Sequence, residues 1–183
     1  MSAVAPASIP DIKTLDALPP EAFAAAVAPL FEGAPRFLAR LAAARPFGSV
    51  ERLFARAREI ARSMPHADQV ELLDAHPRLG APPGSVSSLS FHEQGYDRED
   101  AAGAAEAERA RIAAELERLN EAYETQFGFR FCTFVAGRPR TALLVELQES
   151  LRRRQEAERE RAIVAVVDIA MDRHAKLVAK ETA

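Results

Sequence analysis

A chain of 183 residues, 48% hydrophobic and 28% charged, can build one domain with a hydrophobic core and is too short for two of ordinary size. Its formal net charge of −3 lacks the basic excess typical of nucleic-acid-binding proteins, and no apolar run is long enough to span a membrane. The single cysteine, Cys132, excludes an intrachain disulfide framework and a cysteine-rich zinc site. We therefore expect one cytoplasmic domain that has neither nucleic acid nor a membrane as its partner.

The first part of the chain is predicted to hold a lead-in and then helices. Residues 1–18 contain two prolines and no apolar periodicity, which predicts a flexible or loosely docked lead-in to a helical domain over 19–183. Apolar residues at helical spacing predict three helices, over 20–31, 35–44 and 50–61. Gly33 marks the end of the first of these helices, and Ser49 can cap the third.

The middle of the chain combines helices with a loop rich in proline, glycine and serine. A helix through 69–73 is predicted to end at His76, because Pro77 disfavours the α conformation in the residue before it. The loop over 77–89 is of the kind that often carries functional residues. Alanine-rich, charged sequence over 99–123 predicts a long helix with one apolar stripe.

Residues 127–135 are the one stretch without helical character. They are aromatic and β-branched, which predicts a short extended segment, and one isolated extended segment cannot form a sheet. Thr141 can cap a helix that reaches Leu151, and a last helix is predicted over 163–177. The predicted fold class is all-α, a single-domain compact multi-helix bundle.

The strongest chemical feature is His76, followed after the loop by Ser90, Glu93 and Gln94. A histidine held by Pro77, with a carboxylate and an amide soon after, forms a compact acid/base set, because imidazole titrates near neutral pH. Both parts also have a structural interpretation. His76 suits a helix C-terminus, and Ser90-x-x-Glu93 fits a capping box in which Ser90 accepts from the first turn.

Two common hydrolase patterns fail. A zinc-protease helix starting at His92-Glu93 would need its second histidine where Tyr96 stands. The stretch from Gly84 to Ser88 lacks the second glycine of a nucleophile elbow and follows no predicted strand. The sequence therefore supports neither a metalloprotease nor a serine hydrolase.

The last predicted helix carries two polar residues within its apolar pattern. By ideal helical angle, His174 lies near the middle of the apolar face and Arg173 on its flank. Because a flanking arginine usually extends its charged end to solvent, periodicity singles out His174.

Five short patterns occur in a fixed order along the chain. They are His76-Pro77-Arg78-Leu79-Gly80, Ser90-x-x-Glu93-Gln94, Leu119-Asn120-x-x-Tyr123, Phe127-Gly128-Phe129-x-Phe131 and Ile169-Ala170-x-x-Arg173. Together they resemble the 2-oxo-4-hydroxy-4-carboxy-5-ureidoimidazoline (OHCU) decarboxylases of urate breakdown. The resemblance extends from about the first predicted helix to Leu177, and five matches in order are far more specific than any one of them.

The resemblance implies an all-helical enzyme, often a homodimer, that converts the small molecule OHCU to (S)-allantoin with no metal or organic cofactor. By position it implies catalytic roles for His76, Glu93 and Arg173. It implies substrate contacts at further positions, namely Pro77, Ser90, Gln94 and the backbone of Phe131, Cys132, Thr133, Phe134 and Val135.

The chain departs from the family pattern at two places. Arg78 stands where an acidic or small residue is expected, and Gly95-Tyr96-Asp97 replaces the more usual continuation after Glu-Gln. These departures concern fine substrate specificity. They leave two alternatives open, a related lyase acting on another small ureide or heterocyclic acid, and a noncatalytic helical interaction module with the same fold.

Overall fold

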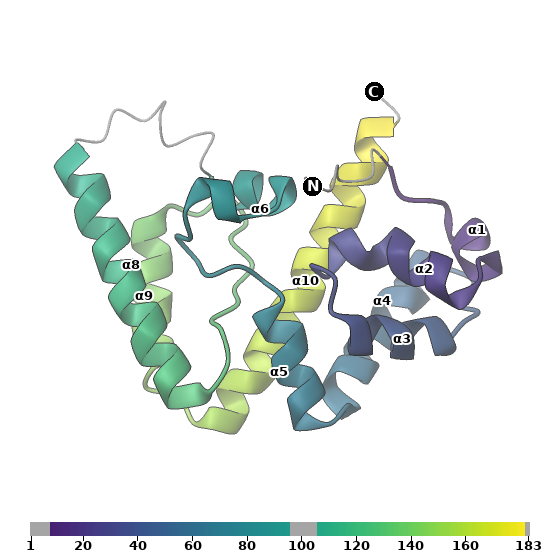
Figure 1. The fold of residues 1–183 in the computed structure, drawn as a ribbon, viewed down its shortest axis with the longest axis horizontal. Helices are drawn as coiled ribbons and strands as arrows, with labels where there is room; N and C mark the ends of the chain where they lie inside the picture. The colour runs from purple at the N-terminus through teal and green to yellow at the C-terminus, as the bar shows by residue number, and fades with distance from the viewer. Residues whose placement is uncertain (1–7, 96–105, 182–183) are drawn as a thin grey trace. The chain divides into compact units, whose positions relative to one another are not determined.

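The structure, a computed structural model, describes residues 8–95 and 106–181 (Figure 1). This part of the chain is helical and contains no strand, which confirms the predicted all-α class. The described chain is divided into two compact units. The first contains residues up to His76 together with those from Ile163 onward, and the second is Pro77–Ala162.

The first unit is built from short and medium helices and the C-terminal part of the last helix. They are α1 (Ile12–Ala17), α2 (Pro20–Val27), η1 (Ala28–Leu30), α3 (Pro35–Ala43), α4 (Val50–Ser63), α5 (His66–Asp74) and α10 (Gln155–Glu181). Prolines at the first helical position begin α2 and α3, where a missing N–H costs nothing. As predicted, the Ser49 hydroxyl caps α4, accepting from the Arg52 amide at 3.3 Å.

The core of this unit is aromatic and aliphatic. Phe31 and Phe37 are fully buried, with ring centroids 4.8 Å apart, and Phe23 packs in the same interior. The apolar face predicted for the third helix is confirmed, because Leu53 and Ala57 of α4 are among its buried residues. Burial of these faces, rather than helix propensity, stabilises helices this short.

The expected lead-in differs from what the structure shows over residues 8–18. Asp11 caps α1 by accepting from two backbone amides, and Leu15 is 1% exposed. The Arg45 guanidinium also donates to the Leu15 carbonyl at 3.1 Å. A helix this short places too few apolar residues in sequence for periodicity to reveal it, and residues 1–7 lie outside the described part.

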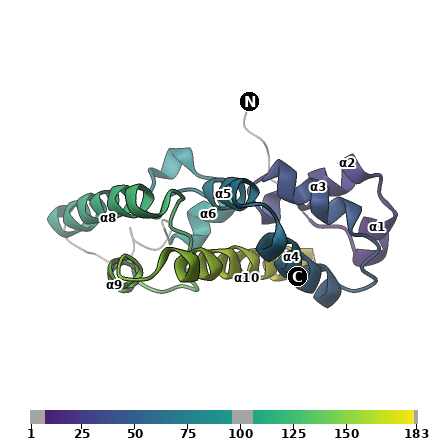
Figure 2. The same cartoon turned by 90° about the horizontal axis from the view of Figure 1, so that it is seen from below.

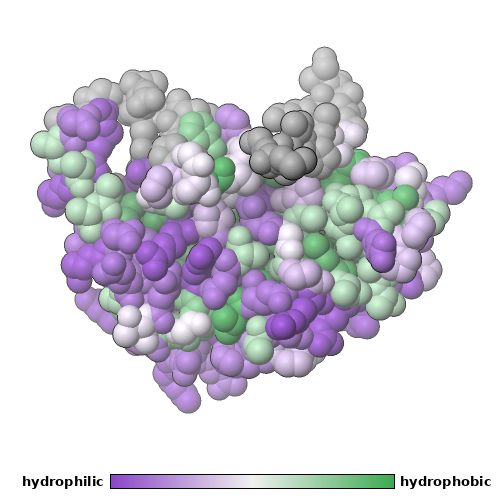
Figure 3. Space-filling view, in the orientation of Figure 1, coloured by the Kyte–Doolittle hydropathy of each residue, from purple (hydrophilic) through white to green (hydrophobic). Residues whose placement is uncertain are grey.

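The second unit holds a loop, two longer helices and an extended segment. Its elements are η2 (Pro83–Ser85), α6 (Ser88–Glu93), α8 (Glu106–Phe127), α9 (Arg140–Ser150) and the first turns of α10. Figures 1 and 2 show α8 and α9 side by side. The face over α8 is mostly hydrophilic (Figure 3), and this fits ion pairs one turn apart such as Arg118–Glu115 at 2.7 Å.

Two predicted helix starts in this half are corrected. The cap of α6 is Ser87, whose hydroxyl accepts from the Ser90 amide at 3.2 Å, so Ser90 lies within the helix and does not cap it. The cap position of α9 is Pro139, so Thr141 lies inside that helix. The long helix predicted from 99 is described from Glu106 onward, and its first seven residues lie outside the described part.

The predicted extended segment follows α8. Gly128, with φ +76°, ends that helix by donating its N–H to the Glu124 carbonyl at 2.9 Å. The Tyr123 ring then packs edge-on against Phe129 and Phe131, with centroids 5.7 and 5.2 Å away. Aromatic packing therefore holds residues 129–135 in place without strand pairing.

Candidate active site

His76 lies just after α5 and is 4% exposed. Its Nδ1 is 3.1 Å from the Leu72 carbonyl oxygen. Because a carbonyl can only accept, Nδ1 carries the hydrogen in the neutral ring, and Nε2 is then the basic atom. The end of α5 therefore selects one tautomer of a buried imidazole.

The surroundings of His76 favour the neutral ring. Burial lowers the pKa of His76 to about 4, and the positive charge of Arg173 acts in the same direction. The negative charge of Glu32 and the hydrogen bond to the Leu72 carbonyl oppose this shift. At neutral pH, His76 is a proton acceptor rather than a cation.

Arg173 is buried within the first unit and does not extend to solvent. It is 1% exposed, and its Nη1 donates to the Pro29 carbonyl at 2.9 Å, while its Nη2 pairs with Glu32 Oε1 at 2.8 Å. His174, which periodicity favoured, is half-buried with its ring edge-on to Phe54 at 5.6 Å, and burial lowers its pKa. The structure thus brings Arg173, and not His174, into the electrostatic environment of His76.

Glu32 is the functional candidate that the sequence did not reveal. It follows η1 with φ +52° and precedes Gly33, which has φ +81°. The available signal was an acidic residue directly before a helix-ending glycine, in an otherwise apolar stretch. That signal is weak, because only the turn geometry directs the carboxylate inward.

The second unit holds Ser90, Glu93 and Gln94 together on α6 and just after it. Ser90 and Gln94 are buried, and Glu93 is half-buried. The Gln94 side chain accepts from the Gly80 amide at 2.7 Å and donates to the Arg78 carbonyl at 3.2 Å. Gln94 therefore fixes the loop that starts at Pro77.

The extended segment presents its carbonyls to two arginines. Arg161 donates to the Cys132 carbonyl at 2.9 Å, and its guanidinium lies 4.9 Å from the centroid of the Phe131 ring. Arg138 donates to the carbonyls of Phe134 and Val135 at 2.6 and 3.1 Å. Because no neighbouring strand donates hydrogen bonds to these carbonyls in the described structure, the arginine side chains supply donors in its place.

A buried carboxylate supports this arrangement. Glu158 is fully buried, accepts from the Tyr123 hydroxyl at 2.7 Å and from Arg161 Nε at 2.8 Å, and also pairs with Arg153 at 3.2 Å. Burial raises the pKa of Tyr123 far above its ordinary value, and the charge of Glu158 adds to the effect. Thr133 is tied to the same unit through Glu146, at 2.8 Å.

The first departure from the family pattern has a structural explanation. Arg78 donates to Glu124 at 2.7 Å and to Glu117 at 2.9 Å, and both glutamates lie on α8. Arg78 therefore anchors the loop to that helix. Of the second departure, Tyr96 and Asp97 lie outside the described residues.

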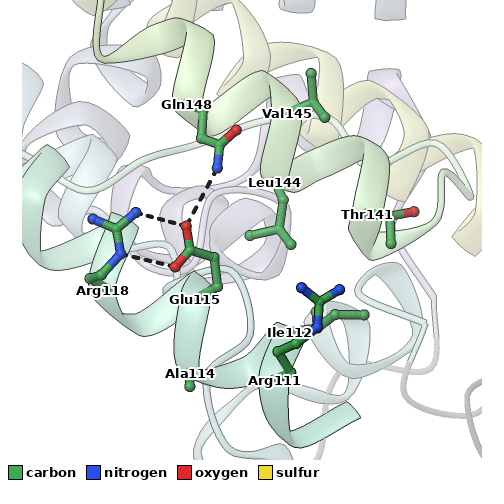
Figure 4. Close-up of a pocket in the computed structure, with 9 residues that line it drawn as sticks. All are labelled: Arg111, Ile112, Ala114, Glu115, Arg118, Thr141, Leu144, Val145 and Gln148. Atoms are coloured by element: carbon green, nitrogen blue, oxygen red, sulfur yellow. Dashed lines mark hydrogen bonds and ion pairs between the residues drawn. The ribbon is translucent and has the colours of Figure 1, made fainter. Parts of the chain in front are cut away.

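A shallow groove lies between α8 and α9 and contains none of the predicted site residues. Its volume is about 550 Å³, and Figure 4 shows Glu115 joined to Arg118 and Gln148 along one side. Within residues 8–95 and 106–181, no cluster of histidine, cysteine and acidic side chains is suited to a metal ion. In the same residues, no helix combines the length and apolarity needed to cross a membrane.

Comparison with known proteins identifies related sequences. The chain is 26% identical over 181 residues to 2-oxo-4-hydroxy-4-carboxy-5-ureidoimidazoline decarboxylase of Haloferax volcanii, covering 93% of this chain and 97% of that protein. It is 30% identical over 152 residues to the uric acid degradation bifunctional protein PucL of Bacillus subtilis, covering 83% of this chain. It spans only 29% of the length of PucL.

Solved structures agree with these sequence matches. A crystal structure of OHCU decarboxylase in the presence of (S)-allantoin aligns with a TM-score of 0.60 and 26% identity, over 80% of this chain and 93% of that one. (S)-allantoin synthase aligns with a TM-score of 0.61 and 22% identity, over 93% of this chain and 54% of that one, which shows a shared fold. The OHCU decarboxylase family matches residues 16–175. The chain belongs to the OHCU decarboxylase family.

Proposed function

We propose that this chain decarboxylates OHCU to (S)-allantoin in urate degradation. Family membership over residues 16–175 and the near full-length match to the Haloferax volcanii decarboxylase support this assignment. The observation that carries it is His76, a buried histidine with a lowered pKa and a defined tautomer, next to the Arg173–Glu32 ion pair. A general base with these properties is what the reaction needs.

The substrate supplies its own electron sink. In OHCU the carboxylate is attached to a carbon beside a C=N bond, so the electron pair left by the departing CO2 flows into that bond. The protein has to bind an anionic ring, remove one proton from the adjacent hydroxyl and deliver one proton to a single face of the enol-like product. Neither metal nor organic cofactor is required, and we propose that the enzyme uses none.

His76 is proposed to accept the hydroxyl proton at Nε2. The Leu72 carbonyl holds Nδ1–H, so the ring presents its basic atom without rearranging. Glu93 is proposed to orient or tune this histidine. The family's pattern implies substrate contacts at Pro77, Ser90, Gln94 and the backbone over 131–135.

Arg173 is proposed to bind the ureido or ring oxygens of the substrate. Tight binding of the substrate carboxylate would stabilise the ground state and so oppose the loss of CO2. Only interactions that are stronger in the transition state than in the ground state accelerate the decarboxylation. A complex with a substrate analogue tests this role. A guanidinium bound bidentately to the carboxylate would refute it.

One assay tests the function directly. OHCU is generated in situ from urate with urate oxidase and hydroxyisourate hydrolase, the protein is added, and the circular dichroism of allantoin is followed as it forms. We expect (S)-allantoin above the uncatalysed rate, and almost none of that acceleration with His76→Asn. Racemic product at the uncatalysed rate would remove the decarboxylase assignment and favour the related-lyase or interaction-module alternative.

Two finer points are also proposed, one from the family resemblance and one from the composition of the chain. We propose that the protein is a homodimer and that it acts in the cytoplasm. Sedimentation equilibrium of the purified chain tests the first, and a monomer mass at all concentrations would contradict it. Fractionation of cells that express the full-length protein tests the second.

A further inference from the structure

The turn after η1 surrounds one guanidinium with acceptors. Within residues 29–32, the Pro29 carbonyl, the Leu30 carbonyl and Glu32 Oε1 lie 2.9, 3.5 and 2.8 Å from nitrogens of Arg173. The side chains of Arg173 and Glu32 are 1% and 14% exposed. Three of the four residues from Pro29 to Glu32 therefore accept from a single buried cation.

The backbone at Glu32 points to the same conclusion. A non-glycine residue at φ +52° is uncommon, because in the left-handed region Cβ of an L-residue lies too close to the following carbonyl oxygen. The turn is held by the Gly33 amide, which donates to the Ala28 carbonyl at 3.0 Å. The strained residue is the one whose carboxylate meets Arg173, so the strain is offset by a buried charge pair.

We propose that Glu32 is a positioning residue, which fixes the guanidinium of Arg173 and neutralises its charge beside His76. The proposal deepens the proposed function and rests on it. Arg173 on α10 and Glu32 after η1 both act electrostatically on His76, in opposite directions.

This pairing has two chemical consequences. A neutralised arginine attracts the substrate carboxylate less, so it does not oppose loss of CO2. Glu32 also offsets part of the effect of Arg173 on the imidazole, because its negative charge raises the pKa of His76 whereas Arg173 lowers it. Without Glu32, His76 would be a weaker base.

The test compares Glu32→Gln, which keeps the size and one acceptor but removes the charge, with Glu32→Asp, which keeps the charge. Glu59→Gln serves as the control, since the Glu59 side chain is 65% exposed in the same unit. The pKa of His76 is measured by NMR titration, with its signal assigned by its absence from His76→Asn. In Glu32→Gln the pKa of His76 should fall by about one unit, because the negative charge is removed. In Glu32→Asp the pKa should stay close to the wild-type value, because the charge is kept.

Kinetics supply the second readout. In Glu32→Gln, kcat should fall about tenfold while KM stays level or decreases, because the weakened base and the stronger grip on the carboxylate both act against the chemical step. Glu32→Asp should recover most of kcat. If Glu32→Gln does not fold, Glu32→Gly takes its place, because glycine also removes the carboxylate and suits the positive φ of this position. Wild-type values of both kcat and the His76 pKa in that variant would overturn the proposal.

The two proposals fail in different ways. If the wild-type protein does not accelerate OHCU decarboxylation, the proposed function fails, and the titration, which needs no substrate, still decides whether Glu32 governs His76. If the wild-type protein is active but Glu32→Gln leaves the His76 pKa and kcat unchanged, only the positioning role fails. If kcat falls equally in Glu32→Gln and Glu32→Asp while the pKa of His76 is unchanged in both, Glu32 has a purely structural role. That result would also overturn the positioning role.

Discussion

Acidification should destabilise this protein through His76. Its folded-state pKa is lowered from 6.5 to about 4, so the unfolded chain binds this proton more readily than the folded one does. A lowered pKa contributes stability that is complete above about pH 6.5 and is lost as the pH falls through about 4. Since a shift of one pKa unit corresponds to 1.36 kcal/mol, the shift of the His76 pKa from 6.5 to about 4 contributes about 3 kcal/mol to the free energy of unfolding at neutral pH.

His76→Asn isolates this contribution. Asparagine can still donate a hydrogen bond to the Leu72 carbonyl, but it does not titrate. The free energy of unfolding is measured with urea at several pH values from 7 to 4, and the wild-type protein should lose about 3 kcal/mol more than the variant over that range. His66→Asn, at an exposed position of the same unit, controls for removal of a histidine. Equal pH slopes for wild type and His76→Asn would refute the reasoning.

Two further predictions concern the second unit. Gly80→Ala should destabilise by about 1–3 kcal/mol, because the residue has φ +81° and a Cβ would lie 2.9 Å from Leu116 Cδ1, whereas Gly84→Ala, with no atom within 4 Å, should be near neutral in the same urea experiment. Similar stability of the two glycine variants would contradict this. Tyr123→Phe should cost about 1–3 kcal/mol, because the buried carboxylate of Glu158 loses a hydrogen-bond donor at 2.7 Å. A wild-type denaturation midpoint for Tyr123→Phe would show that the remaining arginine contacts suffice.

Local sequence predicted most helices because the apolar spacing and the caps act over a few residues. Ser49 caps α4 as expected, and Gly33 follows the end of the first predicted helix. The same reasoning failed where two capping serines compete, since Ser87 and not Ser90 caps α6. It also missed α1, whose buried Leu15 has too few apolar neighbours along the chain to form a pattern.

The candidate site shows the limit of periodicity. Helical angle favoured His174 over Arg173, because a charged side chain on the flank of an apolar face normally reaches solvent. The structure buries Arg173, since Glu32 and the carbonyls of the preceding turn meet its guanidinium from the other end of the chain. Only the order of the five motifs pointed to Arg173 before the structure was known.

The sequence by itself determined the all-α class, the helix that ends near His76 and the family to which the patterns belong, because spacing, proline and motif order are local or linear properties. Tertiary structure alone decided that Arg173, nearly a hundred positions away, would lower the pKa of His76, and that Glu32 would oppose this shift. It alone also showed that Arg78 anchors its loop to α8. These outcomes depend on burial and on charges brought together by folding, which no local pattern encodes.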